Sequence, residues 1–111
     1  MELRERPYGQ TMVLDIHGPL SRETGATVEL ALAVKRLIRE GYRVILLNVG
    51  ELQLIDSVVL GTITQCHTTS ARAGVRLKLL NPTHRMRELL AMTRLDRFID
   101  LAASEDAELG G

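Results

Sequence analysis

The stretch from Val44 to Gly61 constrains the fold of this chain more than any other. It begins with a nearly continuous apolar run that ends at Val49, turns over Gly50 and Glu51, and reaches Asp56-Ser57 where a helical pattern starts. An apolar run without alternation is typical of a parallel strand that is buried on both faces of a sheet. The stretch therefore predicts a strand, a loop and a helix in succession, an arrangement in which α/β proteins often place functional residues.

A serine at the beginning of a helix has two interpretations. Its side chain can cap the helix by accepting a hydrogen bond from the first turn. Because the first N–H groups lack acceptors and form the positive end of the helix dipole, the same position also suits a phosphate, bound or covalently attached. Ser57 is therefore a capping residue or a phosphoacceptor. Asp56 is either a second capping carboxylate or a residue that positions the serine and a partner.

Strand and helix patterns alternate along the rest of the chain. Strands are predicted at 2–8, 11–17, 42–49, 75–80 and 98–101. Helices are predicted to follow caps at Ser21, Asn81 and Ser104, in addition to the helix from Ser57 to about Ala73. The strand at 11–17 alternates apolar and polar residues, so we expect it to be half-buried and to form a hairpin with 2–8.

These elements predict one α/β domain over residues 1–111. Its sheet is expected to be mixed and mostly parallel, with an antiparallel N-terminal edge strand and about four α-helices that lie mostly on one face. A chain of 111 residues is long enough to bury a core of its own.

The charge and aromatic content exclude some classes of partner. The formal net charge is +0, so no overall field attracts nucleic acid or a membrane surface, and aromatic residues make up 3% of the chain, too few for a platform that stacks single-stranded nucleic acid. Basic residues nevertheless concentrate between Arg72 and Arg97 and are followed by an acidic tail. This segment is either a solvated helix face or a patch for an acidic partner protein.

Few residues suggest catalysis or metal binding. Cys66 is the only cysteine, which excludes an internal disulfide and a thiolate metal cluster and fits a reducing compartment; it is expected to be a small core residue. The three histidines, His17, His67 and His84, are scattered, and no G-x-S-x-G elbow, P-loop or H-E-x-x-H motif occurs. We therefore expect no enzymatic activity, no cofactor and no metal.

The segment at the N-terminus and the hydropathy of the chain predict its location. Met1 to Arg6 is charged and leads into no apolar signal core. No apolar run approaches the ~20 residues that a membrane-spanning helix needs. The expected location is the cytoplasm.

Two neighbouring segments resemble a known signature. Leu47-Asn48-Val49-Gly50-Glu51-Leu52 and Ile55-Asp56-Ser57-Val58-Val59-Leu60-Gly61 are similar to the motif of bacterial anti-sigma factor antagonists, which belong to the STAS domain family. Gly18-Pro19-Leu20, Gly74 and Leu95-Asp96-Arg97-Phe98 match the family in order, so the resemblance covers essentially the whole chain. Four positions depart from the pattern: Val58 replaces a second serine, Val59 a glycine, Pro19 a glutamate and Ser21 an acidic residue.

The resemblance implies a regulator rather than an enzyme. It implies that an ATP-using anti-sigma factor kinase phosphorylates Ser57, and that the unmodified protein binds the anti-sigma factor and frees the sigma factor. The implied partner-binding residues are Asp56, Ser57 and Val58, together with the docking loop of Gly18, Pro19, Leu20 and Ser21. Weak homodimerisation is a further expectation. The alternative is a scaffold role in a stress-signalling or lipid-transport assembly, in which Ser57 is never modified.

Overall fold

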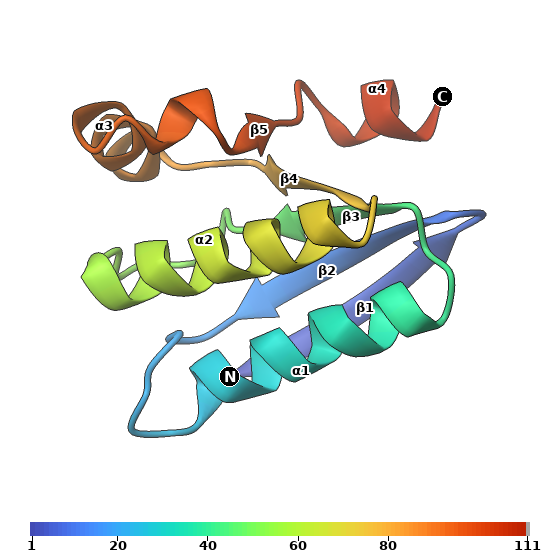
Figure 1. Cartoon of the computed structure of the whole chain (residues 1–111). Helices are drawn as coiled ribbons and strands as arrows, with labels where there is room; N and C mark the ends of the chain where they lie inside the picture. Colours follow the sequence, from blue (N-terminus) through green and yellow to red (C-terminus); the bar gives the residue numbers. More distant parts are fainter. Residues whose placement is uncertain (111) are drawn as a thin grey trace.

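The computed structural model describes residues 1–110, which form five strands and four α-helices (Figure 1). The strands are β1 (Glu2–Tyr8), β2 (Thr11–His17), β3 (Val44–Asn48), β4 (Arg76–Leu80) and β5 (Asp100–Leu101). The helices are α1 (Ala26–Arg39), α2 (Ser57–Arg72), α3 (His84–Met92) and α4 (Glu105–Leu109), and a 3₁₀ turn, η1, covers Leu95–Arg97. The sheet has the order β1-β2-β3-β4-β5, with β1 antiparallel to β2 and all other pairs parallel. The predicted α/β class is confirmed.

The strand register brings the loops that follow β2, β3 and β4 to one edge of the sheet. Asp15 pairs with Asn48, and Asn48 pairs with Leu80, so the carboxyl ends of the three parallel strands are level. The loop from β2 to α1 and the loop from β3 to α2 therefore leave the sheet side by side. In parallel α/β sheets this edge is where ligands and partners usually bind.

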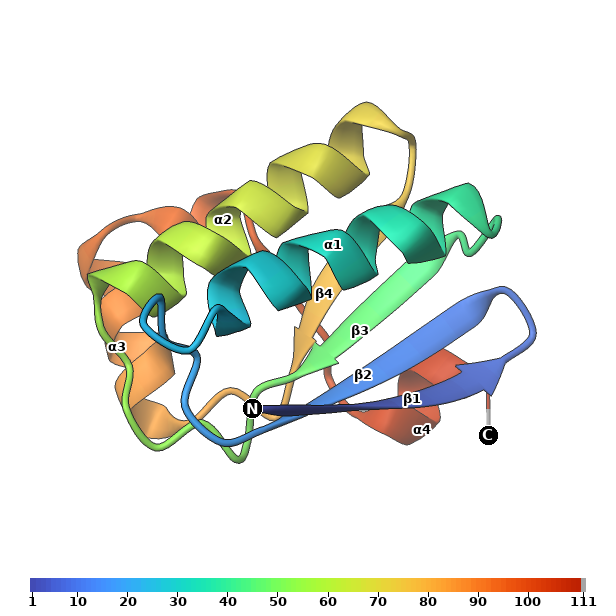
Figure 2. The same ribbon diagram turned by 90° about the horizontal axis from the view of Figure 1, so that it is seen from below.

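Apolar side chains fill the space between the sheet and the pair α1 and α2. Figure 2 shows these two helices side by side across one face of the sheet, with α4 on the other face. Leu14 and Leu47 of the sheet and Leu37 of α1 have no exposed surface, and α2 contributes Val59 and Ile63 to the same core. Removing aliphatic surface of this kind from water contributes ~25 cal/mol per Å² and is the main force holding the layers together.

The second face of the sheet is also covered, which corrects the prediction of a half-buried β2. Val13, Leu46 and Leu80 are buried there together with Ala102 of the C-terminal segment. Asp15, predicted to face solvent, is only 7% exposed. Val13 interrupts the alternation of β2, and the segment that carries α4 folds back over the face that Val13 shares with Asp15.

Two predicted helix caps are wrong. The hydroxyl oxygen of Ser21 accepts a hydrogen bond from the backbone N–H of Glu23 at 3.1 Å and so closes a turn within the loop, while α1 begins only after Gly25, whose φ is 75°. Asn81 likewise lies outside α3, with a φ of 57°, and Thr83 caps that helix. The side chains of serine and asparagine form hydrogen bonds with nearby backbone groups both in turns and at helix caps. The residue type alone therefore does not distinguish a turn from a cap.

Candidate functional site

Ser57 is the first residue of α2 and is exposed, but it is not the cap of that helix. Asp56 takes that role: it has an extended backbone, and its Oδ1 accepts a hydrogen bond from the backbone N–H of Val59 at 3.0 Å. The capping interpretation of Ser57 is therefore wrong, and that of Asp56 is confirmed. Because Asp56 caps the helix, the hydroxyl of Ser57 is not needed as a cap. It lies at the positive end of the helix dipole.

The docking loop lies next to this helix start. Pro19, Ser21 and Leu54 line a shallow hollow together with Asp56 and Val58. Gly18 and Pro19 border an adjoining hollow on the side of the β3–α2 loop. The structure thus brings together residues from two segments that the sequence separates by more than thirty positions.

One residue of the predicted docking loop has a different environment. Leu20 is 4% exposed and packs into the main core, so its side chain anchors the loop. Gly18 has a φ of 88°, a conformation in which residues other than glycine are strained. Of the predicted partner-binding residues, Pro19, Asp56 and Ser57 are exposed, and Ser21 and Val58 are partly so.

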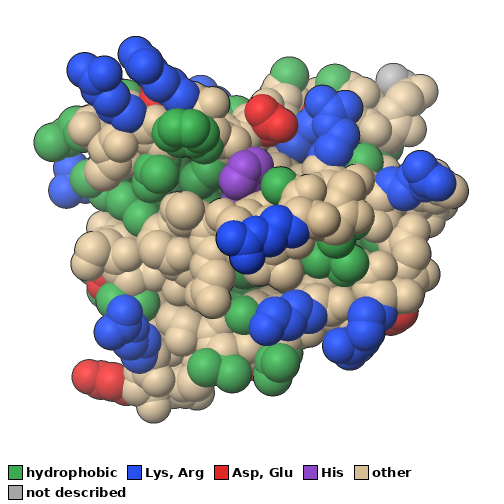
Figure 3. All heavy atoms as spheres, viewed as in Figure 1, with side chains coloured by type: hydrophobic (Ala, Val, Ile, Leu, Met, Phe, Trp, Pro, Cys, Tyr) green, Lys and Arg blue, Asp and Glu red, His purple; other side chains and the backbone are tan. Residues whose placement is uncertain are grey.

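A separate hollow runs between α1 and α2 and includes Ser57. It is lined by Arg22, Thr27, Val28, Ala31, Leu32, Lys35, Ser57, Val58, Gly61, Thr62 and Gln65. Val28 and Leu32 are 60% and 59% exposed, and Arg22 borders both this hollow and the one beside Pro19. Figure 3 shows lysine and arginine side chains interspersed with apolar ones over the face that carries α1 and α2. We call this hollow and the one lined by Pro19, Leu54 and Asp56, with the residues that line them, the Ser57 surface.

Three exposed apolar residues of the Ser57 surface were missed by the sequence analysis. Leu54 is 66% exposed in the loop before α2, and Val28 and Leu32 are one helical turn apart on α1. The spacing of Val28 and Leu32 on the otherwise polar side of α1 was a signal that could have indicated them. Exposed apolar groups that gather around one point are typical of a protein interface.

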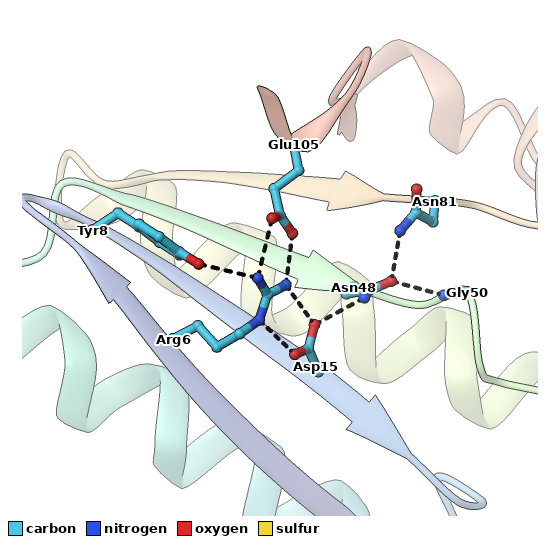
Figure 4. Close-up of polar contacts among 7 residues, drawn as sticks. All are labelled: Arg6, Tyr8, Asp15, Asn48, Gly50, Asn81 and Glu105. Carbon is cyan, nitrogen blue, oxygen red and sulfur yellow. Dashed lines mark hydrogen bonds and ion pairs between the residues drawn. The ribbon is translucent and has the colours of Figure 1, made fainter. Parts of the chain in front are cut away.

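A polar network fixes the sheet edge behind this surface (Figure 4). Nε and Nη2 of Arg6 donate to Asp15 at 2.7 and 3.0 Å, and Nη2 and Nη1 donate to Glu105 of α4 at 2.6 and 3.1 Å. The amide of Asn48 donates to Asp15 at 2.8 Å. Hydrogen bonds from Arg6 hold the pKa of the Asp15 carboxyl, and likewise that of Glu105, below the usual range.

Asn48 extends this network to the loop that leads to Ser57. Its Oδ1 accepts from the backbone N–H of Gly50 at 3.2 Å and from the amide of Asn81 at 3.1 Å. A side chain at Gly50 would be crowded, because its Cβ would lie 3.1 Å from the Cβ of Asn81 and 3.3 Å from the carbonyl oxygen of Asn81. The beginning of the β3–α2 loop is therefore held against the end of β4.

The remaining candidate residues do not assemble into a chemical site. Cys66 is buried, and burial raises the pKa of its thiol to about 11, which disfavours a reactive thiolate. His17, His67 and His84 lie on three different elements, and His84 pairs with Glu88 on the surface. Within residues 1–110 no three His, Cys, Asp or Glu side chains are grouped so that they could hold a metal ion. None of the helices in this range combines the length and hydropathy needed to cross a membrane.

Replacing Asp56 by alanine is expected to lower the free energy of unfolding by about 1 kcal/mol, because the N–H of Val59 loses its acceptor. Asparagine also accepts at this position, so Asp56→Asn is expected to stay within a few tenths of a kcal/mol of the wild type. Urea unfolding of the two variants measures the difference. Equal stability of the alanine and asparagine variants would contradict the capping role.

The whole chain is similar to known proteins. A family model described as the STAS domain matches residues 3–108. A candidate anti-sigma factor antagonist of Thermotoga neapolitana, the homolog of TM1081, is 31% identical over 64 residues, which are 58% of this chain. That match spans 57% of the length of the relative.

Solved structures share the fold at low sequence identity. The NMR structure of TM1081 superposes with a TM-score of 0.81 at 22% identity, over 97% of this chain and 87% of that one. The phosphorylated form of SpoIIAA, a cell fate determinant of Bacillus, gives a TM-score of 0.72 at 22% identity, over 96% of both chains. SpoIIAA in its unphosphorylated form, described as an anti-sigma factor antagonist, gives 0.75 at 21% identity, over 96% of this chain and 93% of that one.

Proposed function

We propose that this chain, which belongs to the STAS domain family, is an anti-sigma factor antagonist that binds a kinase-type anti-sigma factor through the Ser57 surface. Phosphorylation of Ser57 by that partner ends the binding. The observation that carries the proposal is an exposed serine at the start of α2 that leaves capping to Asp56 and lines the hollow between α1 and α2, next to the exposed apolar residues Val28 and Leu32. The similarity to SpoIIAA, which exists in phosphorylated and unphosphorylated forms, supports the same proposal.

The composition of the Ser57 surface suits a protein partner. Protein interfaces combine an apolar centre with a polar rim, and a few large side chains contribute most of the binding energy. Leu54, Val28 and Leu32 can supply such contacts, because each is more than half exposed. Arg22 and Lys35 lie at the rim and favour carboxylates on the partner.

Phosphorylation changes this surface without disturbing the fold. A phosphate adds roughly −1.5 to −2 charges at neutral pH. The free protein tolerates it because negative charge at the start of a helix is stabilising. A partner fitted to the neutral serine would have to bury the phosphate beside the Asp56 carboxylate, so repulsion and desolvation oppose the complex.

The two valines that depart from the family pattern, Val58 and Val59, have no hydroxyl, so Ser57 is the only residue at the start of α2 that could accept a phosphate. Val59 is buried in the core, where its branched side chain packs instead of the usual glycine. Val58 is partly buried between the two hollows. The next hydroxyl on α2, that of Thr62, belongs to a buried residue and donates to the carbonyl oxygen of Val58 at 2.7 Å. Of the hydroxyls at the start of α2, we therefore assign the modification to Ser57.

Isothermal titration of the protein with the anti-sigma factor of its host tests the proposed interface. Leu54→Asp is expected to weaken binding by about 2 kcal/mol, roughly 30-fold, because it places a charge in the apolar centre. Its stability should not change, since Leu54 is largely exposed. Met92→Asp, at an equally exposed position on α3, is the matched control and should bind like the wild type. If both variants bind equally well, the proposed surface is wrong and the scaffold role is favoured.

A further inference from the structure

A further hollow lies at the end of α2 that is remote from Ser57. It is formed by the last turns of α2 and by the segment that leads from η1 into β5, and we call it the Phe98 hollow. Its lining residues are Thr64, His67, Thr68, Ala71, Arg72, Leu95, Phe98 and Ile99. Phe98 is 67% exposed although it is one of only three aromatic residues in the chain. An uncovered aromatic ring at the mouth of an apolar hollow is unusual for a surface without a partner.

The polar groups of the Phe98 hollow indicate the charge of an occupant. Among its lining residues the ionisable side chains are Arg72 and His67, and none is a carboxylate. Nδ1 of His67 is buried and has no hydrogen-bond partner. Arg72 is therefore the charged group that an occupant of the hollow can reach, and it favours a carboxylate. Asp96 and Asp100 lie nearby in the chain but do not line the hollow.

The size of the Phe98 hollow indicates what kind of molecule it accepts. Its volume is about 280 Å³. Clefts that enclose small molecules usually measure ~300–1,000 Å³, whereas a single anchoring side chain of a protein partner needs less. A side chain that packs against Phe98 and Leu95 would fill the hollow and leave the rest of its segment on the surface.

We propose that the Phe98 hollow docks a segment of another protein that carries one large apolar side chain beside a carboxylate. The apolar side chain enters against Phe98, Leu95 and Ile99, and the carboxylate pairs with Arg72. This assigns a role to Arg72, the first residue of the basic stretch, which the proposed function leaves unused.

The Phe98 hollow is independent of the proposed switch because of its distance from Ser57. Arg72, the cation of the hollow, is fifteen positions after Ser57 in α2, which at ~1.5 Å per residue is roughly 22 Å; His67 is ten positions after Ser57, roughly 15 Å. Exposed charges are screened over ~8–10 Å at physiological salt. A phosphate on Ser57 therefore has little effect on this contact, and the chain can stay bound to the second partner in both states.

An NMR titration with a synthetic probe tests this proposal. The probe is a short peptide with one phenylalanine flanked by glutamates, added to the labelled full-length protein. We expect saturable shifts of the backbone amides of residues 64–72 and 95–99. Phe98→Ala and Arg72→Glu should each weaken binding roughly tenfold or more, whereas Ser57→Asp should not change it. Arg39→Glu, a charge reversal on α1, is the matched control and should bind like the wild type.

Three results would overturn the proposal. The first is the absence of saturable shifts at millimolar peptide, and the second is equal binding of a peptide in which lysines replace the glutamates. The third is a concentration-dependent shift of the same amides without any peptide, which would show that a second copy of the chain occupies the hollow. None of these results bears on the role of Ser57, because the titration contains neither the anti-sigma factor nor a kinase.

Discussion

The Ser57→Asp variant is expected to lose about 3 kcal/mol of binding free energy for the anti-sigma factor, roughly a 100-fold increase in Kd. The new carboxylate lies beside Asp56 at a position that the proposed complex buries, and Asp56 is already committed to the N–H of Val59. Two carboxylates desolvated side by side repel each other and lack compensating partners. Isothermal titration with the unmodified partner measures the loss.

Two control variants test whether the loss of binding in Ser57→Asp comes from the charge at this position. One changes Ser57 without adding a charge, and the other adds a charge elsewhere. Ser57→Ala removes the hydroxyl without adding charge and should bind within about tenfold of the wild type, since a single neutral hydrogen bond contributes about 1 kcal/mol. Gln10→Asp adds a carboxylate in the β1–β2 turn, at the opposite edge of the sheet, and should have no effect. The free energy of unfolding of Ser57→Asp should equal or slightly exceed that of the wild type, because the charge is at a helix start. Binding of Ser57→Asp at wild-type affinity would contradict the switch.

Replacing Asp15 by alanine is expected to lower the free energy of unfolding by about 3 kcal/mol, the largest loss of stability that we predict. The change removes the acceptor of two Arg6 hydrogen bonds and of the Asn48 amide in a buried setting. It also weakens the attachment of α4, since Arg6 joins Asp15 to Glu105. Urea unfolding measures the loss. Glu2→Ala, an exposed acidic residue of β1, is the control and should cost less than about 0.5 kcal/mol.

The same carboxyl gives a pH dependence with a defined sign. Arg6 lowers the pKa of Asp15 in the folded state, so its contribution to stability is fully present above the unfolded pKa of about 4. The contribution is lost as the pH falls through the lowered folded value. The stability difference between the wild type and Asp15→Asn should therefore be constant near pH 7 and shrink in acid. A difference that stays the same from neutral pH to about pH 2 would contradict the ion pair.

The sequence predicted the fold because its strand and helix patterns alternate and because the run that begins at Val44 suits a central strand. It did not predict the second buried face of β2. Asp15 appears as an ordinary polar residue in an alternating strand, and its partners Arg6 and Glu105 become neighbours only when β1 pairs and α4 folds back. The pattern of charged residues along the chain does not show which distant segment will cover a strand such as β2.

The sequence located the candidate site but not its details. Asp56 and Ser57 both favour helix starts, so the pattern could not decide which of them caps, and the structure assigns the cap to Asp56. The exposed apolar residues Leu54, Val28 and Leu32 were missed because burial depends on how the loops pack, which residue type does not reveal. The predicted roles in partner binding stay predictions for all of these residues: Gly18, Pro19, Leu20, Ser21, Asp56, Ser57 and Val58.

The central claim is that Ser57 is the residue that a kinase-type anti-sigma factor modifies. Incubation of the protein with ATP and the catalytically active anti-sigma factor of its host, followed by tandem mass spectrometry, locates any phosphate directly. We predict one phosphate on Ser57 of the wild type and none on the Ser57→Ala variant. An unmodified wild-type chain, or a phosphate that persists in Ser57→Ala, would contradict the claim.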